Sequence, residues 1–112
     1  MPSMKAVRLF EFGGPEKLVY GDHPLPDVGP GDVLVNAAGW NDIQSFLDNK
    51  PDYIDRVVAI NLGGTLHLTH ALLPAMIAAG KGKIVNVSSD AGRVGSTGET
   101  AYAAAKGGVI AF

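Results

Sequence analysis

Two short apolar runs, separated by one long helical stretch, constrain the fold of this chain more than any other feature. The runs cover residues 33–38 and 83–88, and they are typical of parallel strands that are covered on both faces. Between them, residues 51–79 repeat apolar side chains at helical spacing. A strand, a long helix and a parallel strand form a βαβ unit, so we predict an α/β fold with a parallel sheet.

The helix predicted over residues 51–79 has start and stop signals in the sequence. Pro51 suits the first helical position, where its missing N–H costs no hydrogen bond. We expect a bend at the 63–64 glycine pair, a kink at Pro74 and an end around residues 78–80.

Tyr102 and Lys106 lie four residues apart in a second helix, which we predict from about Gly98 to Phe112. Positions i and i+4 share one helix face, so the phenol and the ammonium can converge. A cation close to a phenol favours the phenolate and lowers the pKa of the tyrosine, which suits acid–base catalysis. The alternative is an ordinary Tyr–Lys pair on a solvated helix.

This arrangement resembles the short-chain dehydrogenase/reductase family over about residues 33–112, which correspond to the central part of that family's fold. Residues 83–106 carry the resemblance: a strand that ends in hydroxyl side chains, a Gly-rich loop and a helix with Tyr-Ala-Ala-Ala-Lys. The family's Ser-to-Tyr spacing selects Ser89 over Ser88. The resemblance implies a partial Rossmann-like, doubly wound parallel sheet in βαβα order.

The same resemblance implies an NAD(P)-dependent oxidoreductase that interconverts a secondary alcohol and a ketone by Tyr- and Lys-assisted hydride transfer. Residues 88–99 are similar to family members that act on hydroxyacyl or 3-oxoacyl thioesters. The expected partner is therefore a small-molecule alcohol or ketone, whose identity the sequence does not define.

Four catalytic residues follow from the resemblance. Tyr102 would exchange the proton, Lys106 would lower the pKa of Tyr102 and hold the nicotinamide ribose, and Ser89 would hold the carbonyl oxygen. Asn61 lies in Asn61-Leu-Gly-Gly64, which matches a family motif, and it would order the proton relay. A solvent-facing Asn is the alternative reading for Asn61, although Asn is a poor residue for a helix interior.

The cofactor expected from the resemblance is NAD or NADP, and the sequence does not choose between them. Asn36-Ala37-Ala38-Gly39 resembles the family's Asn-Asn-Ala-Gly turn, which passes beside the cofactor, with Ala37 in place of the second Asn. Asn36, Gly39, Tyr102 and Lys106 are thus the candidate cofactor-binding residues, with structural support as the alternative for the first two. The family's Thr-Gly-x-x-x-Gly-x-Gly turn, which holds a pyrophosphate at a helix N-terminus, does not occur in these 112 residues.

The first 32 residues predict a different kind of structure. Residues 4–10 and 17–20 have the pattern of a short antiparallel β-hairpin, followed by a Pro- and Gly-rich extended connector at 21–31. Residues 4–35 resemble the start of medium-chain quinone oxidoreductases and zinc-type alcohol dehydrogenases, but no ligand residue of that family carries over.

We therefore divide the chain into a hairpin with its connector, residues 1–32, and a partial short-chain dehydrogenase Rossmann-like domain, residues 33–112. Two alternatives to an active enzyme remain open. The chain could be a catalytically inactive chimeric or truncated fragment, since the family's pyrophosphate-binding Thr-Gly-x-x-x-Gly-x-Gly turn is absent from it. It could also be a helix-mediated association module, because the helices around residues 51–79 and 98–112 form the subunit interface in the resembled family.

Composition excludes several other functions. The net charge of −2 gives no basic stripe, so nucleic acid is not an expected partner. The absence of cysteine excludes disulfides and thiolate metal sites. His67 and His70 could share a metal, but no third ligand is suitably spaced, so we predict no metal site. Without a signal-peptide core or an apolar run of membrane length, we expect a cytoplasmic protein with no membrane contact.

Open strand edges lead to a last expectation. The two predicted parallel strands have each other as neighbours and otherwise unpaired edges. Exposed apolar edges invite pairing with another chain. We therefore expect a homo-oligomer or an aggregation-prone chain.

Overall fold

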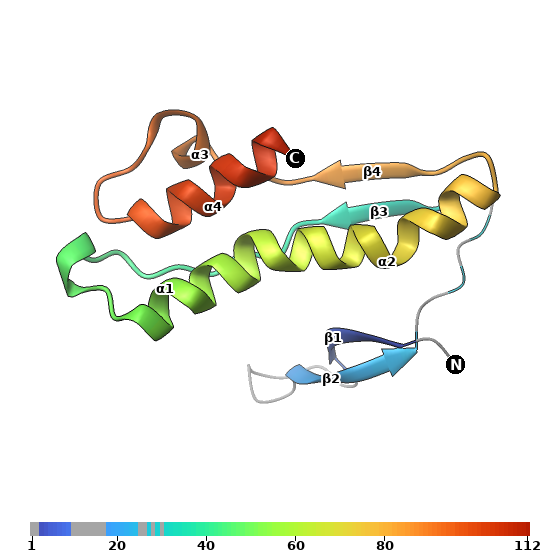
Figure 1. The fold of residues 1–112 in the computed structure, drawn as a ribbon, viewed down its shortest axis with the longest axis horizontal. Coiled ribbons are helices and arrows are strands. Elements are labelled where there is room, and N and C mark those ends of the chain that lie inside the picture. Colours follow the sequence, from blue (N-terminus) through green and yellow to red (C-terminus); the bar gives the residue numbers. More distant parts are fainter. Residues whose placement is uncertain (1–2, 10–17, 25–26, 28, 30) are drawn as a thin grey trace.

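A computed structural model describes residues 3–9, 18–24, 27, 29 and 31–112 of the chain (Figure 1). The described strands form two separate sheets of two strands each. Strand β1 (Ser3–Leu9) pairs antiparallel with β2 (Leu18–Pro24), and strand β3 (Val33–Asn36) pairs parallel with β4 (Lys83–Asn86). The parallel pair and the helices that follow it agree with a partial Rossmann-like α/β arrangement.

The N-terminal strands pair antiparallel, in a register that runs from Ser3 opposite Pro24 to Leu9 opposite Leu18. The connection between the two strands, residues 10–17, lies outside the described residues. Strand β2 continues to Pro24, so the prediction that the connector begins at residue 21 was wrong. Both strands of a two-stranded sheet are edges, where a proline without an N–H is tolerated.

One long helical rod connects β3 to β4 and lies along their sheet (Figure 1). It consists of α1 (Pro51–Val58), a π-helical turn at Ala59–Gly63 and α2 (Gly64–Ala78). The bend expected at the 63–64 glycine pair is thus a π-helical turn, which widens the helix by one residue. The rod ends as expected, since the chain leaves it through Gly80 with a φ of 66°.

The core has a small cluster on the sheet side of the rod. Leu34 from β3 is buried against Leu72 and Met76 from α2, with Leu68 packed at the border. At the other end of the rod, α4 (Thr100–Ala111) packs against α1 and the π-helical turn. Small side chains allow this contact, and Val57, Ala101, Ala105 and Val109 are buried.

A short helix, α3 (Ala91–Val94), lies within the stretch that the sequence predicted to be a Gly-rich loop. It packs backbone to backbone against α4. A Cβ placed on Gly92 would lie only 2.6 Å from the amide nitrogen of Gly107 and 2.6 Å from the carbonyl carbon of Lys106. Glycine at this position therefore brings the chain after β4 directly onto the helix that carries Tyr102.

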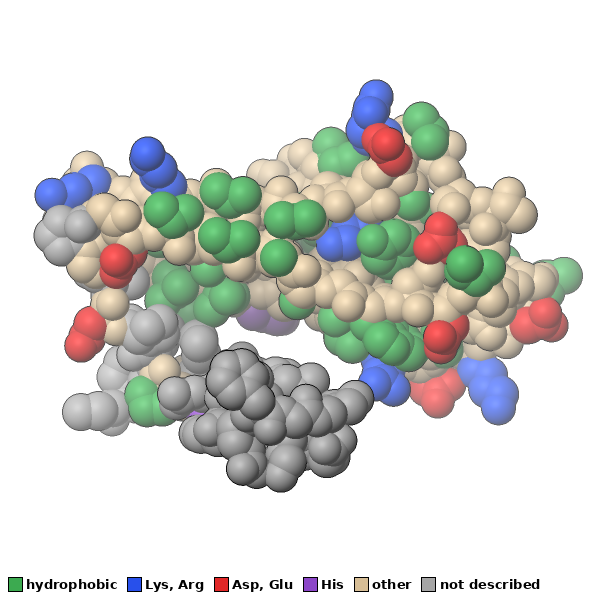
Figure 2. Space-filling model, turned by 180° about the vertical axis from the view of Figure 1, so that it is seen from behind, with side chains coloured by type: hydrophobic (Ala, Val, Ile, Leu, Met, Phe, Trp, Pro, Cys, Tyr) green, Lys and Arg blue, Asp and Glu red, His purple; other side chains and the backbone are tan. Residues whose placement is uncertain are grey.

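The parallel sheet is covered on one face only in the part of the chain that the structure describes. Leu34 and Asn36 are buried, whereas Val33 and Val35 are 48 % and 55 % exposed. All residues of β4 are exposed, and hydrophobic side chains gather on this side of the molecule in Figure 2. The expectation of strands covered on both faces was therefore wrong for the described residues.

By length and mean hydropathy, the rod Pro51–Ala78 could cross a membrane; its most apolar stretch has a mean hydropathy of 1.2. Buried polar side chains nevertheless lie along it, among them Asn61, Thr65 and Thr69. We attribute the apolar composition to packing against the sheet and α4. The absence of membrane contact stays a prediction.

Candidate active site

Tyr102 and Lys106 lie within one turn of each other on α4, as their spacing predicts. The Nζ of Lys106 is 5.8 Å from the centre of the Tyr102 ring. Tyr102 is partly exposed, whereas Lys106 is only 4 % exposed. A partly open phenol with a buried cation behind it is an arrangement that can exchange a proton with a bound molecule.

Lys106 is held between α4 and the end of β4. Its Nζ donates a hydrogen bond of 3.0 Å to the carbonyl oxygen of Val87. The hydroxyl of Ser88 donates one of 2.8 Å to the carbonyl oxygen of Lys106. Burial lowers the pKa of Lys106 below its ordinary value of 10.5, because removal of water disfavours the charged form.

Asn61 is fully buried in the π-helical turn and holds the loop that follows β3. Its Nδ2 donates to the carbonyl oxygens of Trp40 at 2.6 Å and Val57 at 2.8 Å. Its Oδ1 accepts the Trp40 N–H at 3.1 Å. Both N–H groups of the amide are thus used, and only the Oδ1 has a further lone pair to offer.

Gly39 lies where the side chains of Asn61 and Lys106 meet. A Cβ placed on Gly39 would lie 3.3 Å from the Asn61 Oδ1 and 3.8 Å from the Lys106 Nζ. The chain after β3, the π-helical turn and α4 therefore converge at one point. A side chain at position 39 would press on the Asn61 amide beside the ammonium.

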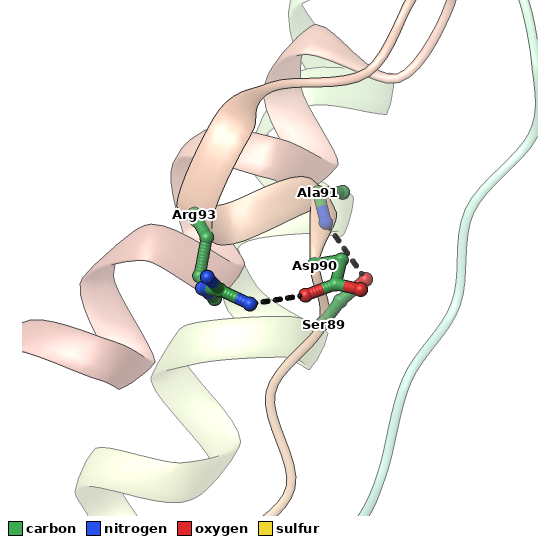
Figure 3. Close-up of polar contacts among 4 residues, drawn as sticks. All are labelled: Ser89, Asp90, Ala91 and Arg93. Carbon is green, nitrogen blue, oxygen red and sulfur yellow. Dashed lines mark hydrogen bonds and ion pairs between the residues drawn. The ribbon is translucent and has the colours of Figure 1, made fainter.

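Ser89 lies two residues before the first residue of α3, as Figure 3 shows. Its Oγ accepts the backbone N–H of Ala91 at 3.2 Å, so its own O–H remains available as a donor. The neighbouring ion pair between Asp90 and Arg93, at 2.9 Å, is exposed. The structure thus leaves Ser89 partly buried with a hydroxyl proton that a ligand oxygen could accept.

Asn36 makes its contacts away from this point. Its Nδ2 donates to the Oγ1 of Thr69 on α2 at 3.1 Å and to the Oδ1 of Asn86 on β4 at 2.8 Å. These bonds join the two strands to the rod. They favour the structural alternative for Asn36, whereas Gly39 lies directly beside Lys106.

Sequence reasoning missed several residues that build the site. Ser88, which was set aside in favour of Ser89, holds the backbone of Lys106. Trp40 is the partner of Asn61, and its place directly after Gly39 was the available signal. Gly92 permits the contact between α3 and α4, but no sequence pattern distinguishes it from a loop glycine.

Comparison with known proteins identifies the family of this chain. The family model described as short chain dehydrogenase matches residues 23–112, and the chain therefore belongs to the short-chain dehydrogenase family. The match does not extend over residues 4–22, so the resemblance of residues 4–35 to medium-chain enzymes stays an unsupported prediction.

Several curated relatives share about two-fifths of their aligned residues with this chain. It is 41 % identical over 86 residues to the D-beta-hydroxybutyrate dehydrogenase of Cupriavidus necator. The aligned region covers 77 % of this chain and 33 % of that relative. It is 43 % identical over 82 residues to the human (3R)-3-hydroxyacyl-CoA dehydrogenase, and the aligned region covers 72 % of this chain and 31 % of that relative. The acetoacetyl-CoA reductase of Shinella zoogloeoides is 41 % identical over 86 residues, covering 77 % and 36 %. The chain thus spans about a third of the length of these relatives.

Proposed function

We propose that this chain carries the proton-transfer site of an NAD(P)-dependent oxidoreductase that interconverts a secondary alcohol and a ketone. The observation that carries the proposal is the buried Lys106 beside the partly exposed Tyr102, with the backbone of Gly39 close to the ammonium. Family membership over residues 23–112 supports the same reaction class.

Tyr102 is the group that we assign to exchange the proton with the substrate oxygen. When Lys106 is protonated, its Nζ places a cation 5.8 Å from the centre of the phenol ring. Ser89 is assigned to donate its O–H to the same oxygen, because its Oγ already accepts the Ala91 N–H. Asn61 is assigned to order the proton relay through the remaining lone pair of its Oδ1.

A nicotinamide cofactor, when bound, supplies or accepts the hydride in this reaction class. The side chains present fit its nicotinamide–ribose end. An ammonium has three N–H donors, and one donor of Lys106 is used by Val87, so others can meet ribose hydroxyls. Gly39 lets the backbone lie close to the ammonium, and Asn36 supports the strand that leads to it. No residue of this chain is assigned to the pyrophosphate or to the choice between NAD and NADP.

The substrate class that we propose is a 3-hydroxyacyl or 3-oxoacyl compound. The relatives are named for hydroxybutyrate, 3-hydroxyacyl-CoA and acetoacetyl-CoA. The likeness of residues 88–99 to thioester-reducing enzymes supports the same class. We further propose a cytoplasmic location and self-association for the chain.

A titration of NADH and NADPH against the purified chain, followed by nicotinamide fluorescence, tests the proposal. We expect saturable binding that weakens when Lys106→Met removes the ammonium, while Lys81→Met, an exposed lysine, leaves binding unchanged. Absence of binding at millimolar cofactor would favour the inactive-fragment alternative. Where acetoacetyl-CoA is reduced, Tyr102→Phe should abolish turnover, and an unchanged rate would show that the activity is a contaminant.

A further inference from the structure

The loop that follows Gly39 is fixed to the rest of the site at several points. Trp40 exchanges hydrogen bonds of 3.1 Å and 2.6 Å with Asn61. The N–H of Gln44 donates to the carbonyl oxygen of Gly98 at 2.9 Å. The loop is therefore tied both to the π-helical turn and to the segment that precedes α4.

Between these two ties lies a chain of side-chain hydrogen bonds. The hydroxyl of Tyr53, on α1, lies 3.0 Å from the Oδ1 of Asn41. The Nδ2 of Asn41 donates to one carboxylate oxygen of Glu99 at 2.8 Å. The other carboxylate oxygen accepts the hydroxyl of Ser96 at 2.5 Å. Three separate segments, α1, the loop and the entry to α4, are joined through Asn41 and Glu99.

Glu99 is not used as a conventional helix cap. It is the residue immediately before α4, yet its side chain makes no capping hydrogen bond. Its carboxylate points back to Asn41 and Ser96, where it makes charge-assisted bonds that are stronger than neutral ones. Because Tyr102 lies one helical turn further on, the position of Glu99 influences the position of the phenol.

We propose that Asn41 and Glu99 form a polar clamp that sets the position of the Tyr102 helix relative to the loop held by Asn61. Both are positioning residues, because they act through Tyr102 and Asn61 rather than on a ligand. Their catalytic consequence rests on the proposed function, since displacement by about 1 Å can cost on the order of a hundredfold in rate. The geometric claim stands on the contacts themselves.

Trp40 gives a direct readout of the clamp. It is the chain's single tryptophan and is adjacent to Asn41. Its ring lies 5.5 Å from that of Tyr53, and the Arg56 guanidinium lies 4.3 Å from its centre. A shift of the loop therefore changes the emission of Trp40 and its quenching by acrylamide, without any need for cofactor or turnover.

An exchange of donor and acceptor tests the clamp in the whole chain. Asn41→Asp places two carboxylates against each other, and we expect a shifted Trp40 emission and stronger quenching. Glu99→Gln keeps an acceptor for Asn41 but loses the charge that strengthens the bond, so it should change both signals less than Asn41→Asp does. The double variant, Asn41→Asp with Glu99→Gln, restores the bond with reversed roles and should return both signals to their wild-type values.

Asp90→Asn is the matched control, because Asp90 is exposed and its partner Arg93 lies outside the clamp. Wild-type signals in Asn41→Asp, or a double variant that stays perturbed or unfolded, would overturn the proposal. Circular dichroism separates a local shift from unfolding. Failure of the proposed function is distinguishable from failure of the clamp. In that case the cofactor would not bind, while the Trp40 signals would still change in Asn41→Asp and return in the double variant.

Discussion

At the scale of single residues, burial of charged Lys106 destabilises the fold, whereas the hydrogen bonds of Asn61 stabilise it. Lys106 is a buried cation, which costs free energy while it is charged. Asn61 is a buried amide whose polar groups are bonded, which ties Trp40 to the helix. The resemblance to the short-chain family singled out both residues as candidates. It did not reveal their partners, because hydrogen bonds to backbone carbonyls leave no side-chain pattern.

Replacement of Asn61 by Ala should destabilise the chain strongly. It leaves the Trp40 N–H and the carbonyl oxygens of Trp40 and Val57 without this partner. Since an unsatisfied buried group costs roughly 1–3 kcal/mol, we expect a loss of about 3 kcal/mol in the free energy of unfolding. Asn49→Ala is the control, because its buried Oδ1 has no hydrogen bond among the described residues. Equal losses in urea denaturation would contradict the account.

The burial of Lys106 predicts a pH dependence of stability. Its pKa is lowered in the folded chain relative to 10.5, so the unfolded chain binds more protons between the two values. Stability should therefore rise with pH from the lowered pKa up to about 10.5, and the penalty should be complete below that window. Lys106→Met should lack this rise when the free energy of unfolding is measured from pH 7 upwards. A wild-type curve parallel to that of the variant would count against burial.

At the scale of elements, the helices were predictable and the strands and short connections less so. The periodic apolar side chains of residues 51–79 predicted the rod, and Gly80 marked its end. The π-helical turn could not be foreseen, because one extra residue in a turn follows from tertiary contacts such as those of Asn61. Helix α3 was missed because Gly92 and Gly95 resemble loop glycines.

Substitution of two helical glycines by alanine should have opposite effects. Gly92→Ala forces a Cβ to within 2.6 Å of the α4 backbone, and such overpacking typically costs about 1–3 kcal/mol. Gly64→Ala meets only the Ala59 carbonyl oxygen at 3.9 Å, so it should gain roughly 0.5–1 kcal/mol from helix propensity. Thermal melts of the two variants check this, and a stabilising Gly92→Ala would refute the close contact.

At the scale of the whole molecule, the open face of the parallel sheet is the main departure from expectation. An apolar run in the sequence does not show whether one face or both faces of the strand are covered. Val35 and Val85 are 55 % and 47 % exposed. A pocket of about 340 Å³ between α2 and Phe112 adds further apolar surface. Leu66, Leu73 and Phe112 line it together with His67, Thr69 and His70. Surfaces of this kind favour association.

A charge on the open sheet should reduce self-association. Val35→Lys places an ammonium on an exposed strand, where lysine opposes pairing with another chain. We expect a smaller average mass by light scattering after gel filtration. Val94→Lys, at a valine that is 80 % exposed on α3, should leave the mass unchanged. If the wild-type chain is monomeric and melts reversibly, the expectation of self-association is wrong.

The central claim is that the fold brings Lys106 into a buried site beside Tyr102, and an NMR titration of the lysine side-chain amino groups tests it most directly. Burial disfavours the charged form, so Lys106 should titrate below 10.5. Lys106→Met assigns the signal by its loss. A Lys106 that titrates at 10.5 or above would contradict the site described here.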